Sequence, residues 1–193
     1  MPNKRIGADR GLSWAAPWLP TGCWLALHAA SGVVPGRSTR SLAVMLTVAK
    51  VTIRKGEPSD YGALVGIDEF ALSHFERANS ISEALAKGEC FTAQSGGDVL
   101  GYVVLNYSFF GFGFIPVIVV AQPHRRRGVG LGLLREAQAQ CTSQKLFTSA
   151  NTSNVEARSL FRRAGFIESG SIENLDADDP EVVYFMTVGK HDG

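Results

Sequence analysis

The spacing of apolar residues predicts alternating strands and helices from residue 51 onward. Three segments of the first half alternate with a period of two and predict strands: Val51–Arg54, Glu89–Ser95 and Val99–Tyr107. The last two flank Gly96-Gly97-Asp98, whose residues are typical of a hairpin turn. A continuous apolar run, Phe114–Ala121, follows a glycine-aromatic link at Phe109–Gly113. Such a run predicts a central strand that is buried on both faces.

Helical spacing of apolar residues predicts the elements between these strands. One helix follows Pro58, with Ser59 or Asp60 as its cap, and a second covers about Ser73–Ala86 and stops at Gly88. The second half adds two helices and three strands, in the order Gly128–Cys141, Leu146–Ser149, Ser153–Ala164, Phe166–Ile172 and Glu181–Val188. The order βααβββαβαββ indicates an α/β (α+β) sandwich with a mostly antiparallel mixed sheet of about six to seven strands, flanked by about four helices.

The composition is that of one folded domain with a tail. The chain has 193 residues, of which 45% are hydrophobic, enough to bury a core. Its net charge of +1 argues against a protein that coats nucleic acid, and no apolar stretch is long enough to span a membrane. Cys23, Cys90 and Cys141 form neither a disulfide framework nor a CxxC metal pair. We expect reduced cysteines that serve as buried hydrophobes, no metal, no nucleic-acid or membrane partner, and a cytoplasmic location.

Residues 1–44 differ from the rest of the chain. They contain all three Trp, four of the eight Pro, five of the 19 basic residues and one of the 18 acidic residues. Residues 45–193 therefore carry 14 basic and 17 acidic residues, a net charge of −3. We interpret residues 1–44 as a disordered or artefactual extension, because Met45 suits a start just before the first strand, and residues 45–190 as the domain. A signal peptide interrupted by Pro17 and Pro20, or a Trp-rich membrane- or partner-binding arm, are the alternatives.

The stretch that carries chemistry joins the apolar run to the third helix. Arg125, Arg126 and Arg127 directly precede Gly128 and Gly130, so an arginine-rich loop meets a glycine-rich helix start. The first N–H groups of a helix are unpaired, and the helix dipole favours an anion there. Glycine also lets a phosphate approach the backbone closely. The pattern predicts a diphosphate cradle; a solvated loop or a surface patch for nucleic acid are the alternatives.

The spacing of the glycines limits which diphosphate ligand the cradle could bind. A Rossmann site needs GxGxxG, and here the third glycine, Gly132, comes one position too early; the GK[ST] of a P-loop is absent. RxxGxG after a buried strand instead fits the diphosphate of coenzyme A. A second segment, Asn154–Phe166, predicts a helix with its apolar residues on one face and Gly165 at its end.

With both segments in this order, the chain resembles the GNAT superfamily of acyl-CoA-dependent N-acyltransferases over about residues 50–188. Arg125–Gly130 matches the family's [QR]xxGx[GA] signature, and Asn154–Phe166 matches its NxxAxxLYxxxGF segment with Phe161 in place of the tyrosine. Val51–Asp60 resembles the usual opening strand and helix of the family. The resemblance implies the GNAT fold, in which the fourth and fifth strands splay apart.

The resemblance also implies acetyl-CoA as co-substrate. Backbone groups of Ile118, Val119 and Val120 would bind the pantetheine amides, and the Val120 N–H would hold the tetrahedral oxyanion. The diphosphate would lie against the start of the third helix and the loop before it: Arg125, Arg126, Arg127, Gly128, Val129, Gly130 and Leu131. Asn154 would bond the pantetheine or the diphosphate, and Phe161 would pack against the cofactor from the core.

The resemblance leaves the catalytic acid and base unassigned. Phe161 stands where many relatives have a tyrosine acid, and no Asp or Glu occurs between Asp98 and Glu136, where many have a base on the central strand. Relatives that acetylate ribosomal-protein N-termini carry Glu at the position of Ser149, so we do not expect that activity. The remaining candidates are Glu69, His74, Glu181 and Tyr184, each of which also suits an ordinary surface or core residue.

We therefore expect an N-acetyltransferase that moves an acetyl group from acetyl-CoA to a primary amine by direct attack in a ternary complex. The acceptor is a small molecule or a protein Lys or N-terminus, and a homodimer is common in this fold. One alternative is a CoA-binding regulatory module or pseudo-enzyme, because Phe161 lacks a hydroxyl and the central strand lacks an acid. Another is a nucleic-acid-binding protein that uses Arg125–Arg127.

Overall fold

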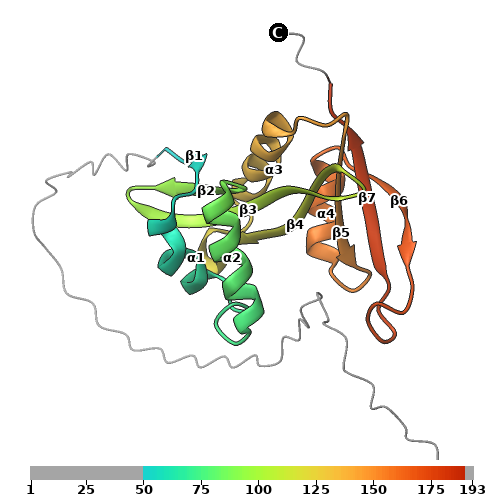
Figure 1. Cartoon of the computed structure of the whole chain (residues 1–193), viewed down its shortest axis with the longest axis horizontal. Coiled ribbons are helices and arrows are strands. Elements are labelled where there is room, and N and C mark those ends of the chain that lie inside the picture. The colour runs from blue at the N-terminus through green and yellow to red at the C-terminus, as the bar shows by residue number, and fades with distance from the viewer. Residues whose placement is uncertain (1–49, 190–193) are drawn as a thin grey trace, which may run out of the picture.

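The computed structural model describes residues 50–189 (Figure 1). Interpretations of residues 1–44 concern a segment outside these described residues. The strands are β1 Thr52–Lys55, β2 Cys90–Ser95, β3 Asp98–Phe109, β4 Phe112–Val120, β5 Lys145–Asn151, β6 Ile167–Ile172 and β7 Glu181–Thr187. The helices are α1 Tyr61–Ile67, α2 Phe75–Lys87, α3 Val129–Gln140 and α4 Val155–Arg163, with short 3-10 turns at Pro58–Asp60 and Gln122–His124. No helix within residues 50–189 is both long and apolar enough to cross a membrane.

The seven strands form one mixed sheet in the order β1-β2-β3-β4-β5-β7-β6. Every neighbouring pair is antiparallel except β4 and β5, which run parallel. α3 supplies the crossover that a parallel pair requires. The predicted class, strand number and helix number are confirmed.

Helices cover both faces of the sheet and define two hydrophobic clusters. α3 and α4 pack on one face, where Leu133, Leu146 and Tyr184 are fully buried. α1 and α2 pack on the opposite face of the β1–β4 half, around Leu64 and Ile81 (Figure 1). The two clusters explain the apolar periodicity of the sequence, because each helix turns one stripe of side chains toward the sheet.

The link predicted at Phe109–Gly113 is wrong. β3 continues to Phe109 and β4 begins at Phe112, so Phe110 and Gly111 alone form the hairpin turn. Both turn residues have positive φ, 51° and 77°, as a type I′ turn requires. Alternating Phe and Gly are compatible with a strand on each side, and the pairing of β3 with β4 decides the outcome.

β4 is less buried than the sequence predicts. The strand is central, but only Gly113 and Ile115 are buried; Pro116 is exposed and Val117–Val120 are half-buried. The prediction of burial on both faces therefore fails for the second half of the strand. This half has lost its neighbour β5, so its side chains lack cover on one side.

Candidate active site

The sheet opens between β4 and β5. These strands pair at three positions, and the last is Ile115 with Thr148, although β4 continues to Val120 and β5 to Asn151. The Thr148 hydroxyl donates to the Ile115 carbonyl at 3.0 Å and holds the last rung in place. Pro116 follows immediately and has no N–H to offer to a further rung. The predicted splay is confirmed.

The start of α3 lies at the end of β4, beyond a short 3-10 turn. Gly128 caps the helix with φ of 85°, and a Cβ placed on Gly128 would meet nothing within 4 Å. Arg126 also has positive φ, 60°, which is unusual for a residue with a side chain. The α3 start therefore borders open space at Gly128, where an anion could approach the helix N-terminus.

Gly130 has a different task from the one predicted. A Cβ on Gly130 would lie 3.0 Å from the Leu160 side chain of α4 and 3.5 Å from that of Val120. Gly130 is buried and lets α3 approach α4 and β4 closely. The expectation that its missing Cβ makes room for a phosphate is wrong for this residue, although its N–H still belongs to the first turn of α3.

One of the three arginines binds the backbone of β4, and the other two are exposed to solvent. The Arg125 Nε donates to the Val120 carbonyl at 3.1 Å, so this side chain ties the loop to the end of β4. Arg126 is 90% exposed and lies 3.8 Å from Glu156 at the start of α4. Arg127 is exposed as well. Arg126 and Arg127 can therefore turn toward an anion without breaking a buried contact.

The second motif places α4 against the sheet. Asn154 is its N-cap, and its side-chain oxygen accepts a hydrogen bond from the Ala157 N–H at 3.0 Å. Phe161 is 2% exposed and packs against the rings of Phe166 and Tyr184. Its role in the described residues is that of a core side chain, and contact with a cofactor stays a prediction.

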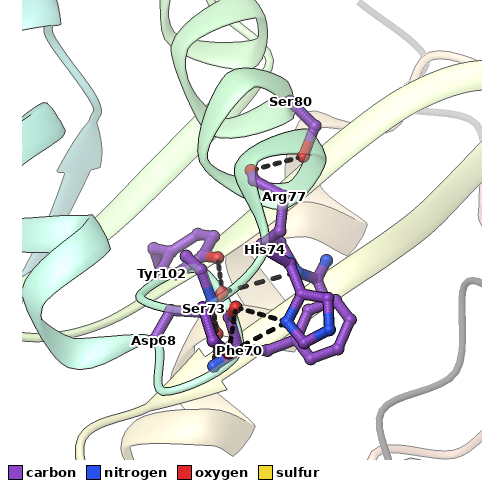
Figure 2. A network of polar contacts seen from close by, with 8 residues as sticks. Asp68, Phe70, Ser73, His74, Arg77, Ser80 and Tyr102 are labelled. Atoms are coloured by element: carbon purple, nitrogen blue, oxygen red, sulfur yellow. Dashed lines mark hydrogen bonds and ion pairs between the residues drawn. The ribbon is translucent and has the colours of Figure 1, made fainter.

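A polar network fixes the turn between α1 and α2 (Figure 2). Asp68 is buried, and one carboxylate oxygen accepts the Phe70 and Ala71 N–H groups at 3.0 and 3.2 Å. The other accepts the hydroxyl of the fully buried Tyr102 in β3 at 2.6 Å. Arg77 lies 3.5 Å from the same oxygen and stacks over the Phe70 ring. The hydrogen bond between Asp68 and Tyr102 therefore fixes the turn to the sheet. No local sequence pattern predicts this contact.

Three of the four catalytic candidates have ordinary surroundings. Glu69 and His74 are exposed on the α1–α2 turn. The His74 ring stacks on Phe70 at 3.7 Å, and its Nδ1 lies within hydrogen-bond distance of the Ser73 hydroxyl and the Phe70 carbonyl (Figure 2). Tyr184 is fully buried; its hydroxyl donates to Glu168 and accepts from the Arg158 Nε at 3.0 Å. The Tyr184 hydroxyl proton is therefore engaged in the hydrogen bond to Glu168.

Glu181 differs from the other candidates. It opens β7 opposite Asn151 of β5, and its side chain interacts with the hydroxyl of Ser149. Its Oε2 atom is buried and accepts no hydrogen bond from any residue between 50 and 189. Burial raises the pKa of Glu181, the nearby Asp176 and Asp179 raise it further, and the Ser149 hydroxyl lowers it. The sequence did not predict the contact between Glu181 and Ser149, because the two residues meet through the pairing of β5 with β7.

The described cysteines are core residues, as predicted. Cys90 is fully buried in the cluster under α1 and α2, and burial raises the pKa of its thiol to about 12. Cys141 is also buried, at the end of α3. A buried thiol with a raised pKa is a poor nucleophile, so we do not expect Cys90 to carry the acyl group. Among residues 50–189, no group of His, Cys, Asp and Glu side chains is arranged to hold a metal ion.

The splayed sheet, with a glycine-capped helix at the end of the open strand, defines an acyltransferase fold and site. A family model described as the Acetyltransferase (GNAT) family matches residues 57–166. The chain belongs to this family and is an acetyltransferase. A comparison with curated proteins gives no match.

Solved structures agree with this assignment. The chain is 30% identical to a GNAT-family acetyltransferase from Bacillus cereus ATCC 10987, with a TM-score of 0.69 over 73% of this chain and 99% of that one. YncA of Salmonella typhimurium, a putative acetyltransferase solved with acetyl-CoA, shares 18% identity and a TM-score of 0.61 over 74% and 96%. The ribosomal-protein-S18-alanine N-acetyltransferase of Escherichia coli shares 17% identity and a TM-score of 0.61 over 73% and 96%. The last two show a common fold.

Proposed function

We propose that this acetyltransferase moves the acetyl group of acetyl-CoA to a primary amine. The observation that carries the proposal is the gap between β4 and β5, which begins after Ile115 and Thr148 and leads to the glycine-capped start of α3. An extended pantetheine arm fits a strand edge that lacks a neighbour, since alternate peptide groups point sideways along it. A diphosphate fits the unpaired N–H groups at the helix start.

Each part of the chain has a task in this proposal. Ile118, Val119 and Val120 offer backbone groups to the pantetheine amides, and the α3 start binds the diphosphate with help from Arg126 and Arg127. The Val120 carbonyl already accepts a bond from Arg125, so the ligand contact at Val120 is through its N–H. The Val120 N–H adjoins the loop that leads to α3, so it suits the part of the pantetheine nearest the diphosphate. The Ile118 N–H lies nearer the start of the gap, and in this proposal it would stabilise the tetrahedral oxyanion.

The acceptor amine would enter on the face that carries α1 and α2. In this proposal the turn that the Asp68–Tyr102 hydrogen bond holds would form one side of the approach, and the acidic β6–β7 loop would form the other. An acidic border favours a cationic amine, of a small molecule or of a protein Lys or N-terminus. The thiolate leaves without a tyrosine acid, because a thiol pKa near 8.5 makes it a good leaving group.

Ligand-dependent stability tests the cofactor half of the proposal. Thermal unfolding is measured with acetyl-CoA, CoA, NAD and ATP in parallel, with release of free thiol recorded in the presence of an amine panel. A ligand at about 100 times its dissociation constant adds about 2.7 kcal/mol of stability. We expect a raised Tm with acetyl-CoA and CoA alone, and amine-dependent thiol release. A folded protein that responds to neither coenzyme contradicts the proposal.

A CoA-binding module without turnover is the second candidate. Phe161 favours it, since a phenyl ring 2% exposed in the core has no proton to donate. This alternative expects the same rise in Tm with acetyl-CoA but no thiol release with any amine of the panel. The pair of measurements therefore separates the two candidates.

A further inference from the structure

We propose that Glu181 is the general base that takes the proton from the acceptor ammonium group. This inference rests on the proposed function, because it assigns a catalytic residue to amine acetylation. Three features of Glu181 carry it: the face of the sheet on which it lies, its contact with Ser149 beside the point where the sheet opens, and a buried oxygen, Oε2, with no hydrogen-bond partner among residues 50–189.

The register of β5 and β7 fixes the face. Ala150 and Val182 are opposite one another and belong to the cluster under α3 and α4. Side chains alternate along a strand, so the next pair, Asn151 and Glu181, points to the other face. That face carries α1 and α2 in the neighbouring half of the sheet, and it is the side from which an amine approaches.

The register also fixes the position. Thr148 makes the last β4–β5 pair, so Ser149 is the first β5 residue beside the gap. The Glu181 side chain interacts with the Ser149 hydroxyl and therefore brings its carboxyl group to the mouth of the gap. A thioester held along the open part of β4 has its carbonyl carbon in this gap. The base and the reacting carbon are then on either side of the incoming nitrogen.

The carboxylates next to Glu181 are engaged in hydrogen bonds, whereas one oxygen of Glu181 accepts none within the described part of the chain. Asp179 is held by the Ser153 N–H and hydroxyl at 2.9 and 2.6 Å, and Asp176 accepts from the Asn151 amide at 2.8 Å. Asn151 also donates to the Asp179 carbonyl, so its amide is turned to the β6–β7 loop. Within residues 50–189, by contrast, the Glu181 Oε2 atom is buried and accepts no hydrogen bond.

The charge around Glu181 suits a base. The charged groups that act on it are Asp176 and Asp179 of the loop, and the polar groups that face it from β5 are Ser149 and Asn151. Burial is the main cause of its raised pKa, and both aspartates add to it. A carboxylate with a raised pKa holds a proton better and is a stronger base near neutral pH.

In the proposed step, Glu181 deprotonates the acceptor and the resulting amine attacks the thioester. One N–H bond of the ammonium group breaks, and its proton goes to the Glu181 carboxylate. The freed electron pair of nitrogen forms the C–N bond with the thioester carbonyl carbon, whose oxygen takes the negative charge. The C–S bond then breaks, the thiolate leaves, and the second nitrogen proton leaves to water.

The test compares Glu181→Gln with wild type in the full chain. The readouts are acetyl-CoA affinity, kcat/KM for the best amine of a panel that contains a polyamine, an amino acid, an aminoglycoside and a peptide, and its pH profile. We expect kcat/KM at pH 7 to fall at least about 100-fold with acetyl-CoA affinity within about twofold. The acid limb of the wild-type profile should be absent in the variant.

Two further variants make the result specific. Glu136→Gln removes a carboxylate of α3 that accepts a bond from the Gln140 amide and lies outside the proposed cofactor and acceptor sites, and it should keep wild-type kcat/KM. Ser149→Glu in the Glu181→Gln background returns a carboxylate to the same point from β5, and it should restore at least about tenfold of the lost rate.

The outcomes separate the two proposals. Wild-type protein that binds no acetyl-CoA and releases no thiol overturns the proposed function and this assignment together. Wild-type turnover with Glu181→Gln equally active, or with its acid limb unchanged, overturns the assignment of Glu181 alone.

Discussion

At the scale of single residues, two carboxyl groups show how neighbours set opposite acid strengths in one fold. Asp60 accepts two hydrogen bonds from the Arg54 guanidinium, at 2.7 and 2.8 Å, and one from the Glu57 N–H. The Arg54 bonds hold the pKa of Asp60 below its usual range. No cation among residues 50–189 acts on the pKa of Glu181, and burial raises that pKa. The first group is arranged to stay charged, and the second to exchange a proton.

Replacing Asp60 with Asn should destabilise the protein in a pH-dependent way. A carboxyl with a depressed folded-state pKa stabilises the fold above its unfolded pKa and loses this effect as the pH falls through its folded value. Because Arg54 is 37% exposed, solvent reduces the gain. We expect Asp60→Asn to lower the free energy of unfolding by about 1–2 kcal/mol at pH 7. Urea unfolding at pH 7 and near pH 3 checks it; an equal loss at both contradicts the account.

Gly128 and Gly130 should respond differently to alanine. Gly128→Ala puts a Cβ at φ of 85°, where strain costs about 1 kcal/mol, and places it in the open space where the diphosphate is proposed to bind. Gly130→Ala instead pushes on Leu160 from 3.0 Å. We expect Gly128→Ala to lose acetyl-CoA affinity and Gly130→Ala to lose mainly stability, by calorimetry and Tm. Equal affinity losses would return Gly130 to the phosphate site.

At the scale of elements, each end of the proposed cofactor site is the start of a helix. α3 opens at Gly128, which supplies no side-chain cap, whereas α4 opens at Asn154, whose side chain accepts from one of the helix's own N–H groups. A helix start that is capped by a side chain is satisfied, and one that is capped by glycine keeps its unpaired donors for an anion. The sequence difference between Gly128 and Asn154 therefore favours the α3 start, rather than the α4 start, as the proposed diphosphate site.

Two substitutions of Asn154 separate its cap from its predicted cofactor bond. Asn154→Ala removes the bond to the Ala157 N–H, and we expect a loss of about 1 kcal/mol of stability. Asn154→Asp keeps a capping oxygen, so stability should stay near wild type, but it replaces the amide donor with a negative charge beside the diphosphate. Acetyl-CoA affinity should therefore fall in both variants. An Asp variant with full affinity contradicts the cofactor role.

At the scale of the whole molecule, the β4–β5 junction joins two half-sheets. β1 to β4 carry α1 and α2 on one face, while β5, β7 and β6 carry α4 on the other (Figure 1). Three paired positions connect the halves in the sheet, with α3 bridging them through its contact with α4. A ligand in the gap touches both halves, so its binding should tighten the junction.

Hydrogen exchange tests this view of the junction. Amide groups of β4 between Val117 and Val120 that face the gap should exchange faster than those of β2 at Cys90–Ala93, which lies between β1 and β3. Acetyl-CoA should protect the β4 amides and leave the β2 amides nearly unchanged. Uniform protection across both strands, or none in β4, contradicts binding along the gap.

The sequence by itself determined the elements and the family, and it located the loop and helix start where the cofactor is proposed to bind. Period-two and helical spacing placed every strand and helix of residues 50–189, because side-chain burial follows local geometry. It failed at Phe110-Gly111 and in the second half of β4, where pairing between strands decides the result. RxxGxG could be recognised in the sequence because a phosphate site of the proposed kind uses consecutive backbone groups of one loop and one helix.

Only the tertiary structure decided which side chains meet. Glu181 and Ser149 are distant in sequence and adjacent through β5 and β7, and Asp68 reaches Tyr102 across 34 residues. Likewise, Leu160 explains Gly130, and Phe166 and Tyr184 explain why Phe161 is a core residue. Local patterns record which face of an element is buried. They do not record which element covers that face, and acid–base chemistry depends on that neighbour.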